Sequence, residues 1–262
     1  MRFAIGTCFG FAIACMIAPI AYAATSGSPI APFDLREAFQ TRSPWRLTAT
    51  QEPMVEDPAG QLAPGAIHLC MSNDAGRTCD PAPNRALRLT NDGDVFSQPH
   101  FLLRAQVVRP AGKPRLFLLE LASFHAGNGD QRVALQLYTY DQAKDVFRLA
   151  YSHRTGRNNN QEIRYVEAGP LSGAVIASDP TSDAPFRYWI TVDRPNGSGV
   201  YQPVLRFRSA TAYGDGNPLA VIDSEMPDIQ RRLGIWLPGM ALPLPAKACP
   251  RPHLVGGALW CS

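Results

Sequence analysis

Apolar and polar residues alternate in short stretches along most of the chain, and a period of two is typical of β-strands with one buried face. Phe101, Leu103 and Val107 lie on one side of such a stretch. Arg104 and Gln106 lie on the other side. The pattern predicts strands over residues 45–50, 66–71, 86–90, 101–108, 116–121, 132–140, 147–151, 162–167, 173–177, 186–193 and 204–209. We therefore expect an all-β, antiparallel fold.

Turn sequences connect neighbouring predicted strands into hairpins. Residues 141–145 have turn chemistry and separate two alternating stretches. Residues 194–199 contain an Asn-Gly pair, which favours a tight reversal. Between these features, residues 116–121 are nearly all apolar, as expected of a strand that is buried on both faces.

Helical signals are few. Asp34 can cap one short helix over residues 34–40. Near the C-terminus, Ser224 can cap a second helix, Pro227 suits its first turn and Gly234 can end it. The tail, residues 236–262, is rich in proline, and we expect it to be irregular.

The first 23 residues have the pattern of a cleavable signal peptide. Arg2 supplies the positive charge, residues 3–20 are mostly apolar, and residues 21–23 (Ala-Tyr-Ala) provide the small side chains that a signal peptidase requires. A membrane anchor is one alternative, but glycines and a proline interrupt the apolar run. Lipid attachment at Cys15 is another, but Ala12 stands where a large aliphatic residue is expected. We expect a periplasmic or secreted product.

The rest of the chain, residues 24–262, is expected to form a single, mostly β domain, because its length fits one such domain. Residues 24–32 are small and rich in Ser, Gly and Pro, which predicts a flexible start. No long apolar run recurs after residue 23, so we expect no membrane span once the signal is cleaved.

Four cysteines remain after cleavage, and an even number in an exported chain predicts disulfides. Of the three pairings, we favour Cys70–Cys79 and Cys249–Cys261, because each closes a short loop. Each bridge is expected to add roughly 2–3 kcal/mol of stability, and the second would pin the C-terminal tail. Zinc binding is the alternative, but the spacing is unsuitable, and no metal site is predicted.

Charge gives no sign of a nucleic-acid partner. The formal net charge is +3, and the basic residues are scattered along the chain. Only Lys113, Lys144 and Lys247 are lysines. Because a nucleic-acid-binding surface needs a basic patch or stripe, no nucleic-acid partner is expected.

Residues 72–78 read Ser-Asn-Asp-Ala-Gly-Arg-Thr and match the pattern S-x-D-x-G-x-T. This segment resembles an Asp-box, the hairpin motif of sialidase-type β-propellers, although Cys79 stands where an aromatic residue usually follows. Asp74 can accept hydrogen bonds from the amides of its own turn, and Gly76 can adopt a positive φ. The flanking strands would bring Cys70 and Cys79 together. The resemblance covers this loop alone and implies no catalytic residue.

Two later segments resemble each other. In each, a strand is followed by Ser, then by Thr155 or Thr211, and then by a loop rich in Gly and Asn, at residues 156–163 and 214–221. These loops resemble those of FG-GAP-type propeller repeats, which often bind calcium. A looser third copy spans residues 118–133. The repeats favour a small β-propeller-like architecture, with a β-sandwich as the alternative.

Calcium binding is an alternative that this resemblance raises. Oxygen-rich side chains suit calcium, but a tight site normally requires more carboxylates than Glu162 alone supplies in the first loop. We therefore predict no cofactor.

Polar loops at residues 125–130, 153–162 and 211–217 contain the candidate binding residues. They are His125, Asn128, Asp130, His153, Asn158, Asn160, Glu162, Asp215 and Asn217. In addition, Trp189 and Tyr138 share strand faces with polar residues, and an exposed aromatic ring there could stack on a sugar.

No recognised catalytic motif accompanies these loops, and no catalytic residue is assigned. The sequence therefore favours an exported, non-catalytic protein that binds a glycan or a protein. The alternative is a hydrolase of envelope or extracellular polymers in which His125 or His153 works with an acidic partner.

Overall fold

The fold is described from a computed structural model, which covers residues 28–57, 60–88, 98–110, 112–125, 131–156 and 160–262. The expected signal peptide lies outside the described residues. The strands are β1 (Ser28–Asp34), β2 (Arg46–Gln51), β3 (Val55–Glu56), β4 (Leu62–Ala63), β5 (Ile67–Ser72), β6 (Phe101–Val108), β7 (Leu116–His125), β8 (Gln131–Asp141), β9 (Val146–Gly156), β10 (Glu162–Tyr165), β11 (Val175–Pro180), β12 (Arg187–Pro195), β13 (Tyr201–Ala212), β14 (His253–Val255) and β15 (Ala258–Trp260). The helices are α1 (Arg36–Phe39), α2 (Ala82–Arg88) and α3 (Val221–Arg232).

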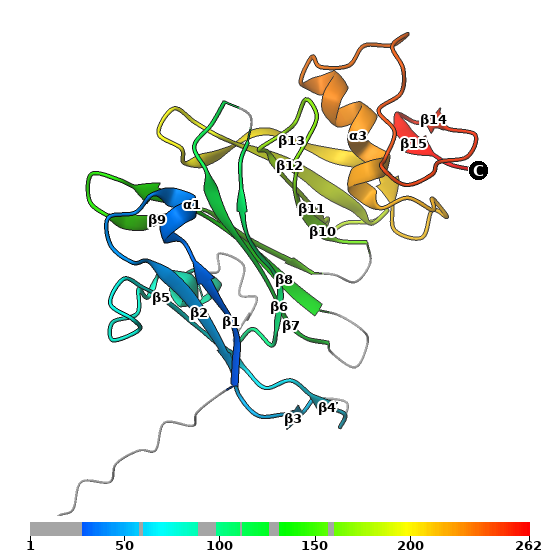
Figure 1. Cartoon of the computed structure of the whole chain (residues 1–262). Coiled ribbons are helices and arrows are strands. Elements are labelled where there is room, and N and C mark those ends of the chain that lie inside the picture. Colours follow the sequence, from blue (N-terminus) through cyan, green and yellow to red (C-terminus); the bar gives the residue numbers. More distant parts are fainter. Residues whose placement is uncertain (1–27, 58–59, 89–97, 111, 126–130, 157–159) are drawn as a thin grey trace, which may run out of the picture.

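Three antiparallel sheets follow one another along the chain and pack in layers (Figure 1). The first has the order β1-β2-β5, the middle sheet β6-β7-β8-β9, and the third β10-β11-β12-β13. Helix α3 and the β14–β15 hairpin lie on the outer side of the third sheet. The expectation of a mainly β, antiparallel fold is therefore confirmed, but the described sheets form no propeller.

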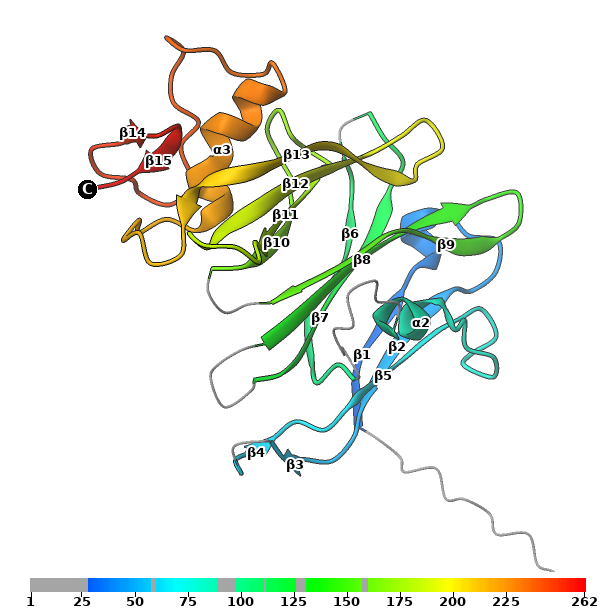
Figure 2. The same ribbon diagram turned by 180° about the vertical axis from the view of Figure 1, so that it is seen from behind.

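The first hydrophobic core lies between the first sheet and the middle sheet. Phe117 and Leu119 of β7 contribute to it from one side, and Leu47 and Met71 contribute from the first sheet. Helix α2 closes this core with Leu87, and Figure 2 shows the helix beside β5.

The second core lies between the other face of the middle sheet and the third sheet. Leu116 and Leu118 of β7 and Leu135 of β8 pack here against Val175 and Ala177 of β11. Successive residues of β7 thus enter different cores, as the period of two requires. The prediction that this strand is buried on both faces is confirmed, and each fully buried leucine contributes roughly 1.5–3 kcal/mol.

The third core joins the third sheet to α3. Ile176, Ile190 and Val192 pack against Val221 and Ile229 of the helix. The predicted C-terminal helix therefore exists, and its apolar face covers the outer sheet.

The predicted start of this helix was wrong by four residues, because its N-cap is Ala220 rather than Ser224. Helix α3 begins at Val221, so Ser224 and Pro227 lie inside it rather than at its start. The capping role belongs to a residue distant in sequence, because Glu162 Oε1 accepts a hydrogen bond from the Ile222 amide at 2.7 Å. The predicted end is correct, because Gly234 has a φ of +69° directly after the last turn.

Residues 86–90 were predicted to form a strand, and this prediction was wrong for the described part. Residues 82–88 form α2, which begins after Asp80, whose Oδ1 accepts a hydrogen bond from the Ala82 amide at 2.8 Å. Pro81 and Pro83 beside this Asp are typical of a helix start. The shorter α1 confirms the expected helix at residues 34–40, with Asp34 Oδ1 accepting from the Arg36 amide.

The internal resemblance between the two repeated segments has a structural counterpart. Strands β9 and β13 are each the last strand of a four-stranded antiparallel sheet whose strands pair in chain order. The similarity therefore reflects two successive sheets of the same order, packed face to face.

Both predicted disulfides are present in the structure. Cys70–Cys79 closes the loop after β5, and Cys249–Cys261 pins the tail. The tail also contains the β14–β15 hairpin, so it is less irregular than expected. Such bridges indicate an oxidising compartment outside the cytoplasm.

The Asp-box-like loop has the predicted internal bonds. The Thr78 amide donates to Asp74 Oδ1 at 3.0 Å, and the Gly76 amide donates to Ser72 Oγ at 2.8 Å. The bond from the Thr78 amide is the main reason why the pKa of Asp74 is lowered. Gly76 has a φ of +88°, which favours glycine at this position. These bonds make the loop a structural unit.

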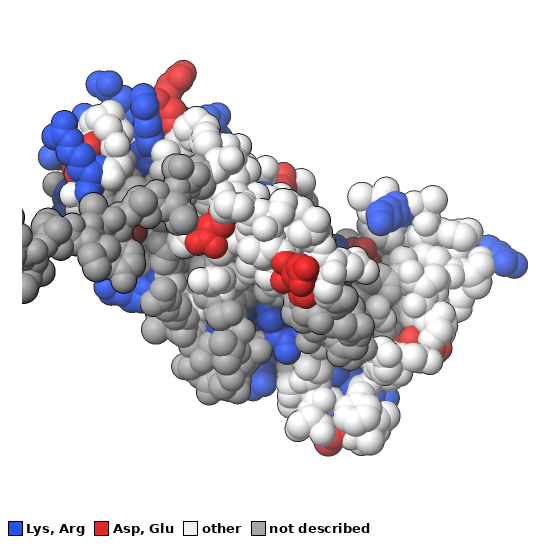
Figure 3. All heavy atoms as spheres, turned by 90° about the horizontal axis from the view of Figure 1, so that it is seen from below, with Lys and Arg blue, Asp and Glu red and all other residues white. Residues whose placement is uncertain are grey.

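The surface carries its charges in separate groups. In the view of Figure 3, Lys and Arg side chains form one group at one end and several isolated ones, and most of the described surface between them is uncharged. Among the described residues, no helix is long and apolar enough to cross a membrane.

Candidate functional site

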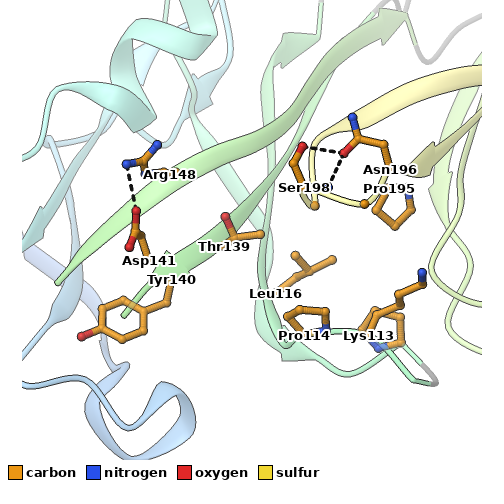
Figure 4. Close-up of a pocket in the computed structure, with 13 residues that line it drawn as sticks. Lys113, Pro114, Leu116, Thr139, Tyr140, Asp141, Arg148, Pro195, Asn196 and Ser198 are labelled. Carbon is orange, nitrogen blue, oxygen red and sulfur yellow. Dashed lines mark hydrogen bonds and ion pairs between the residues drawn. The ribbon is translucent and has the colours of Figure 1, made fainter. Parts of the chain in front are cut away.

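A cleft of about 380 Å³ opens where the β6–β7 connection, the end of β8 and the β12–β13 turn meet (Figure 4). We call it the hairpin cleft. It is lined by Pro110, Lys113, Pro114, Leu116, Thr139, Tyr140, Asp141, Arg148, Pro195, Asn196, Gly197, Ser198 and Gly199. Its size lies within the usual range for small-molecule sites, roughly 300–1,000 Å³.

The β12–β13 turn forms one wall of the hairpin cleft. Asn196 Oδ1 accepts hydrogen bonds from the Ser198 amide at 3.0 Å, the Ser198 hydroxyl at 2.7 Å and the Val200 amide at 3.1 Å. Gly199 has a φ of +82°, and a Cβ built there would lie 3.8 Å from Thr139 Cγ2. The turn is therefore internally braced and held close to β8 without a ligand.

The floor of the hairpin cleft is apolar. Leu116 at the start of β7 and the rings of Pro114 and Pro195 provide it, together with the methyl group of Thr139. Tyr140 contributes little to it, because its ring is directed away from the Asn196–Ser198 turn in Figure 4 and its hydroxyl donates to Asp145 Oδ1 at 2.5 Å.

The rim of the hairpin cleft is polar and carries a small positive excess. Arg148 Nη2 and Asp141 Oδ2 form an ion pair at 2.8 Å, in which the arginine side chain is half exposed. Lys113 also lines the cleft and forms no ion pair with another described residue. Two cations against one carboxylate favour a ligand that brings a negative charge.

Asp145 shapes the β8–β9 turn beside the cleft. Its carboxylate accepts hydrogen bonds from the Ser43 hydroxyl at 2.5 Å and from Trp45 Nε1 at 3.3 Å, as well as from Tyr140. Desolvation acts to raise the pKa of Asp145, but these hydrogen bonds lower it overall. The turn is thus bound to the segment before β2.

The sequence-predicted His153 lies between the middle and third sheets, not at the hairpin cleft. Its Nε2 is 3.2 Å from Asp179 Oδ2 on β11, and both side chains are about one-third exposed, at 31%. Beside it, the Tyr151 hydroxyl donates to Asp193 Oδ2 at 3.1 Å. Burial raises the pKa of Asp193, which is 7% exposed. The acidic partner of His153 is therefore Asp179, which the sequence had not singled out.

His125 lies at the end of β7 and is distant from His153. His125 pairs with Gln131 of β8, whereas His153 pairs with Leu135. Two strands and four residues separate them, or roughly 10 Å across and 14 Å along the sheet. The two histidines therefore do not share one site, and His125 lies instead near the ring of Phe101 at 6.3 Å.

Glu162 and Asn160 lie beside α3. Glu162 binds the helix start through Ile222 and forms an ion pair with Arg164 at 3.0 Å. Asn160 has a φ of +62° and is hydrogen-bonded to the side chain of Tyr188. Both residues line a second cavity, discussed below.

Asp215 and Asn217 organise the turn before α3. Asp215 Oδ2 accepts from the Ala212 amide at 2.9 Å. Asn217 Nδ2 donates to Ser224 Oγ at 2.8 Å and to the Leu259 carbonyl at 3.0 Å. These contacts fasten the helix to the C-terminal hairpin, which is a structural role. Asn128, Asp130 and Asn158 lie outside the described residues.

The aromatic residues considered for sugar stacking differ in exposure. Tyr138 is fully buried in the first core, and its hydroxyl donates to Gln136 Oε1 at 2.5 Å, so it cannot contact a ligand. Trp189 is partly exposed, and the guanidinium of Arg206 lies 4.5 Å from its ring centre.

Among the described residues, no group of three or more His, Cys, Asp or Glu side chains could hold a metal ion. The carboxylate of Glu162, on which the calcium alternative depended, is bonded to Arg164 and to the start of α3.

Sequence reasoning missed the hairpin cleft almost entirely. It identified residues 194–199 as a turn but assigned no binding role to them. Lys113 and Thr139 have no motif around them, and their proximity to the turn arises only when the middle and third sheets pack together. No family model, curated protein or solved structure matches the chain.

Proposed function

We propose that this chain is an exported, non-catalytic binding protein, periplasmic or secreted, and that its hairpin cleft binds a short acidic glycan. The hairpin cleft carries this proposal. Its apolar floor suits the C–H face of a sugar ring, and its braced turn offers fixed polar groups at the rim. The excess of Lys113 and Arg148 over Asp141 favours a sugar that bears a carboxylate.

Export supports the same proposal. The expected signal peptide and the two disulfides agree with a protein that works outside the cytoplasm, where polymers of uronic acids are accessible. The braced turn supports binding without large rearrangement, because a preformed site loses less entropy when a ligand binds.

A calorimetric titration with trigalacturonic acid tests the proposal, with neutral maltotriose as the comparison ligand. We expect binding of the acidic trisaccharide and much weaker binding of the neutral one. Thr139→Trp should abolish binding, because the indole fills the floor while the strand keeps a residue of high β propensity. Lys113→Ala should weaken binding roughly 1.5- to 5-fold, the value of one exposed ion pair.

Lys247→Ala is the matched control, because Lys247 is exposed in the C-terminal tail and does not line the hairpin cleft. Equal binding by wild type and Thr139→Trp would contradict the proposed site. Absence of binding by both trisaccharides would contradict the proposed ligand class.

A hydrolase remains the second candidate function, and the His153–Asp179 pair is the observation that favours it. A histidine oriented by a carboxylate can act as a general base. His153→Gln should then abolish hydrolysis of a susceptible polymer in a substrate screen. Unchanged hydrolysis in this variant would count against an enzymatic role for the pair.

A further inference from the structure

A second cavity, of about 290 Å³, lies at the opposite end of the middle sheet. We call it the inter-sheet cavity. It is lined by Glu120, Val133, Thr155, Gly156, Asn160, Gln161, Glu162, Ile163 and Ala220. Val133 here and Thr139 in the hairpin cleft lie on the same strand, six residues or about 20 Å apart. The two sites are therefore separate.

Three adjacent strands of the middle sheet form one wall of the inter-sheet cavity. Val133 of β8 pairs directly with Thr155 of β9, and Glu120 comes from β7 on the other side of β8. Ile163 of β10 faces them from the third sheet and belongs to the second core, as Val133 does. The inter-sheet cavity thus lies at the edge of the second core, where polar side chains replace apolar ones.

The Thr155 hydroxyl is the feature that points to a ligand. Thr155 is 4% exposed, and its Oγ1 has no hydrogen-bond partner among the described residues. Nearly all buried hydroxyl groups in folded proteins are bonded, because an unmade bond leaves the cost of desolvation uncompensated. The unbonded Thr155 hydroxyl therefore favours a ligand in the inter-sheet cavity that can form a hydrogen bond with it.

A neighbouring arginine shows the same deficiency. Nε and Nη2 of Arg104 are buried and without a hydrogen-bond partner, although they lie 3.6 Å from Glu120 Oε2 and 3.4 Å from Glu167 Oε1, respectively. Thr155 in the cavity wall and Arg104 beside Glu120 thus both keep polar atoms without a hydrogen-bond partner among the described residues.

The two charged side chains that line the inter-sheet cavity, Glu120 and Glu162, are each already paired with an arginine, and this sets the class of ligand. Glu120 is opposed by Arg104, and Glu162 is paired with Arg164 at 3.0 Å. An anion would meet the two carboxylates, and a cation would have to compete with the arginines that already pair with them. A hydroxyl group, in contrast, can both donate to and accept from Thr155.

Two described residues that line the inter-sheet cavity, Gly156 and Gln161, are bonded to each other. The Gly156 amide donates to Gln161 Oε1 at 3.0 Å, and a Cβ at this glycine would lie 2.2 Å from the same oxygen. Asn160 holds a φ of +62°, which non-glycine residues rarely adopt. Asparagine adopts this left-handed conformation more readily than other non-glycine residues.

We propose that the inter-sheet cavity binds a small, uncharged, hydroxyl-rich molecule of the size of a free monosaccharide or polyol, with the Thr155 hydroxyl as a direct contact. This site is independent of the hairpin cleft. It adds a second, neutral ligand to a protein whose hairpin cleft favours an acidic one.

Methyl NMR of the full mature chain tests the proposal, with D-glucose, N-acetyl-D-glucosamine and glycerol as probes. We expect at least one probe to shift the methyl signals of Thr155 and Val133 in a saturable manner. Thr155→Val keeps the shape of the side chain but removes the hydroxyl, and it should weaken binding roughly 2- to 10-fold, the value of one hydrogen bond. Thr155→Ser restores the hydroxyl and should restore binding.

Thr50→Val on β2 is the matched control and should bind as wild type does. Thr139→Trp should also leave these shifts unchanged, which distinguishes this site from the proposed function at the hairpin cleft. Equal affinity in wild type and Thr155→Val would overturn the proposal. The proposal would also be overturned if none of the three probes shifted these methyl signals in the wild-type protein, because the cavity would then hold water only.

Discussion

Glu225 gives the most quantitative prediction about stability. It is fully buried on α3, and its Oε1 accepts hydrogen bonds from the Thr211 amide at 2.7 Å and the Thr211 hydroxyl at 2.6 Å. Its Oε2 has no partner among the described residues. Burial raises the pKa of Glu225 above its ordinary value of 4.5, and the bonds from Thr211 oppose this only in part.

The raised pKa sets the sign of the pH dependence. Between pH 4.5 and the higher pKa of the folded protein, Glu225 is more often protonated in the folded protein than in the unfolded chain, so the folded state binds more protons. The free energy of unfolding must therefore fall as the pH rises from 4.5 towards the folded pKa. The largest slope for one group is about 1.4 kcal/mol per pH unit. Asp193, whose pKa is also raised, contributes with the same sign above 3.8.

Replacing Glu225 by Gln removes its titration and isolates its contribution. Urea unfolding followed by tryptophan fluorescence at pH 4.5 to 7.5 measures the effect. The stability of Glu225→Gln relative to wild type should increase with pH, by up to about 1.4 kcal/mol per unit. Glu37→Gln, at an exposed site on α1, serves as the control and should show no such trend. A stability difference between Glu225→Gln and wild type that is independent of pH would refute the reasoning.

Three further predictions concern the stability of the fold that positions the two sites. Cys249→Ser in combination with Cys261→Ser should lower the free energy of unfolding by roughly 2–3 kcal/mol, measured by urea unfolding, and an unchanged midpoint would contradict a stabilising role for this bridge. Leu118→Ala in the second core should cost about 2–5 kcal/mol by the same assay, and a loss below 1 kcal/mol would show that the sheets repack freely. Gly173→Ala should lower the melting temperature, because Gly173 has a φ of +82° and the new Cβ would lie 2.7 Å from Pro110 Cβ. Gly197→Ala is the control and should leave the melting temperature unchanged, because nothing lies within 4 Å of a Cβ built there. Similar melting temperatures of the two variants would contradict this account.

The sequence predicted the strands well where the apolar pattern is unambiguous. The nearly all-apolar run at residues 116–121 predicted burial on both faces, and β7 divides its side chains between two cores as expected. The disulfides could be predicted because each pair is close along the chain. The propeller prediction failed because two successive sheets with the same strand order produce the same repeat in the sequence, whether the sheets pack around an axis or in layers.

Helix boundaries and sites were harder to predict, because distant residues determine them. Ser224 looked like a cap, but Glu162 supplies that function from β10. In the hydrolase alternative, Glu162, Asp130 or Asp215 could have been the acidic partner of His153, yet sheet packing places this histidine beside Asp179. The hairpin cleft arises from the β6–β7, β8 and β12–β13 segments, none of which carries a recognisable binding motif.

Chemical-shift mapping of the labelled mature protein with trigalacturonic acid tests the central claim most directly. A glycan bound in the hairpin cleft should shift the amide signals of Thr139, Asp141, Ser198 and Gly199 together in a saturable manner, and Thr139→Trp should abolish the shifts. If the amides of these residues stay in place while the ligand binds elsewhere, or if no signal moves at millimolar ligand, the hairpin cleft is not a glycan-binding site.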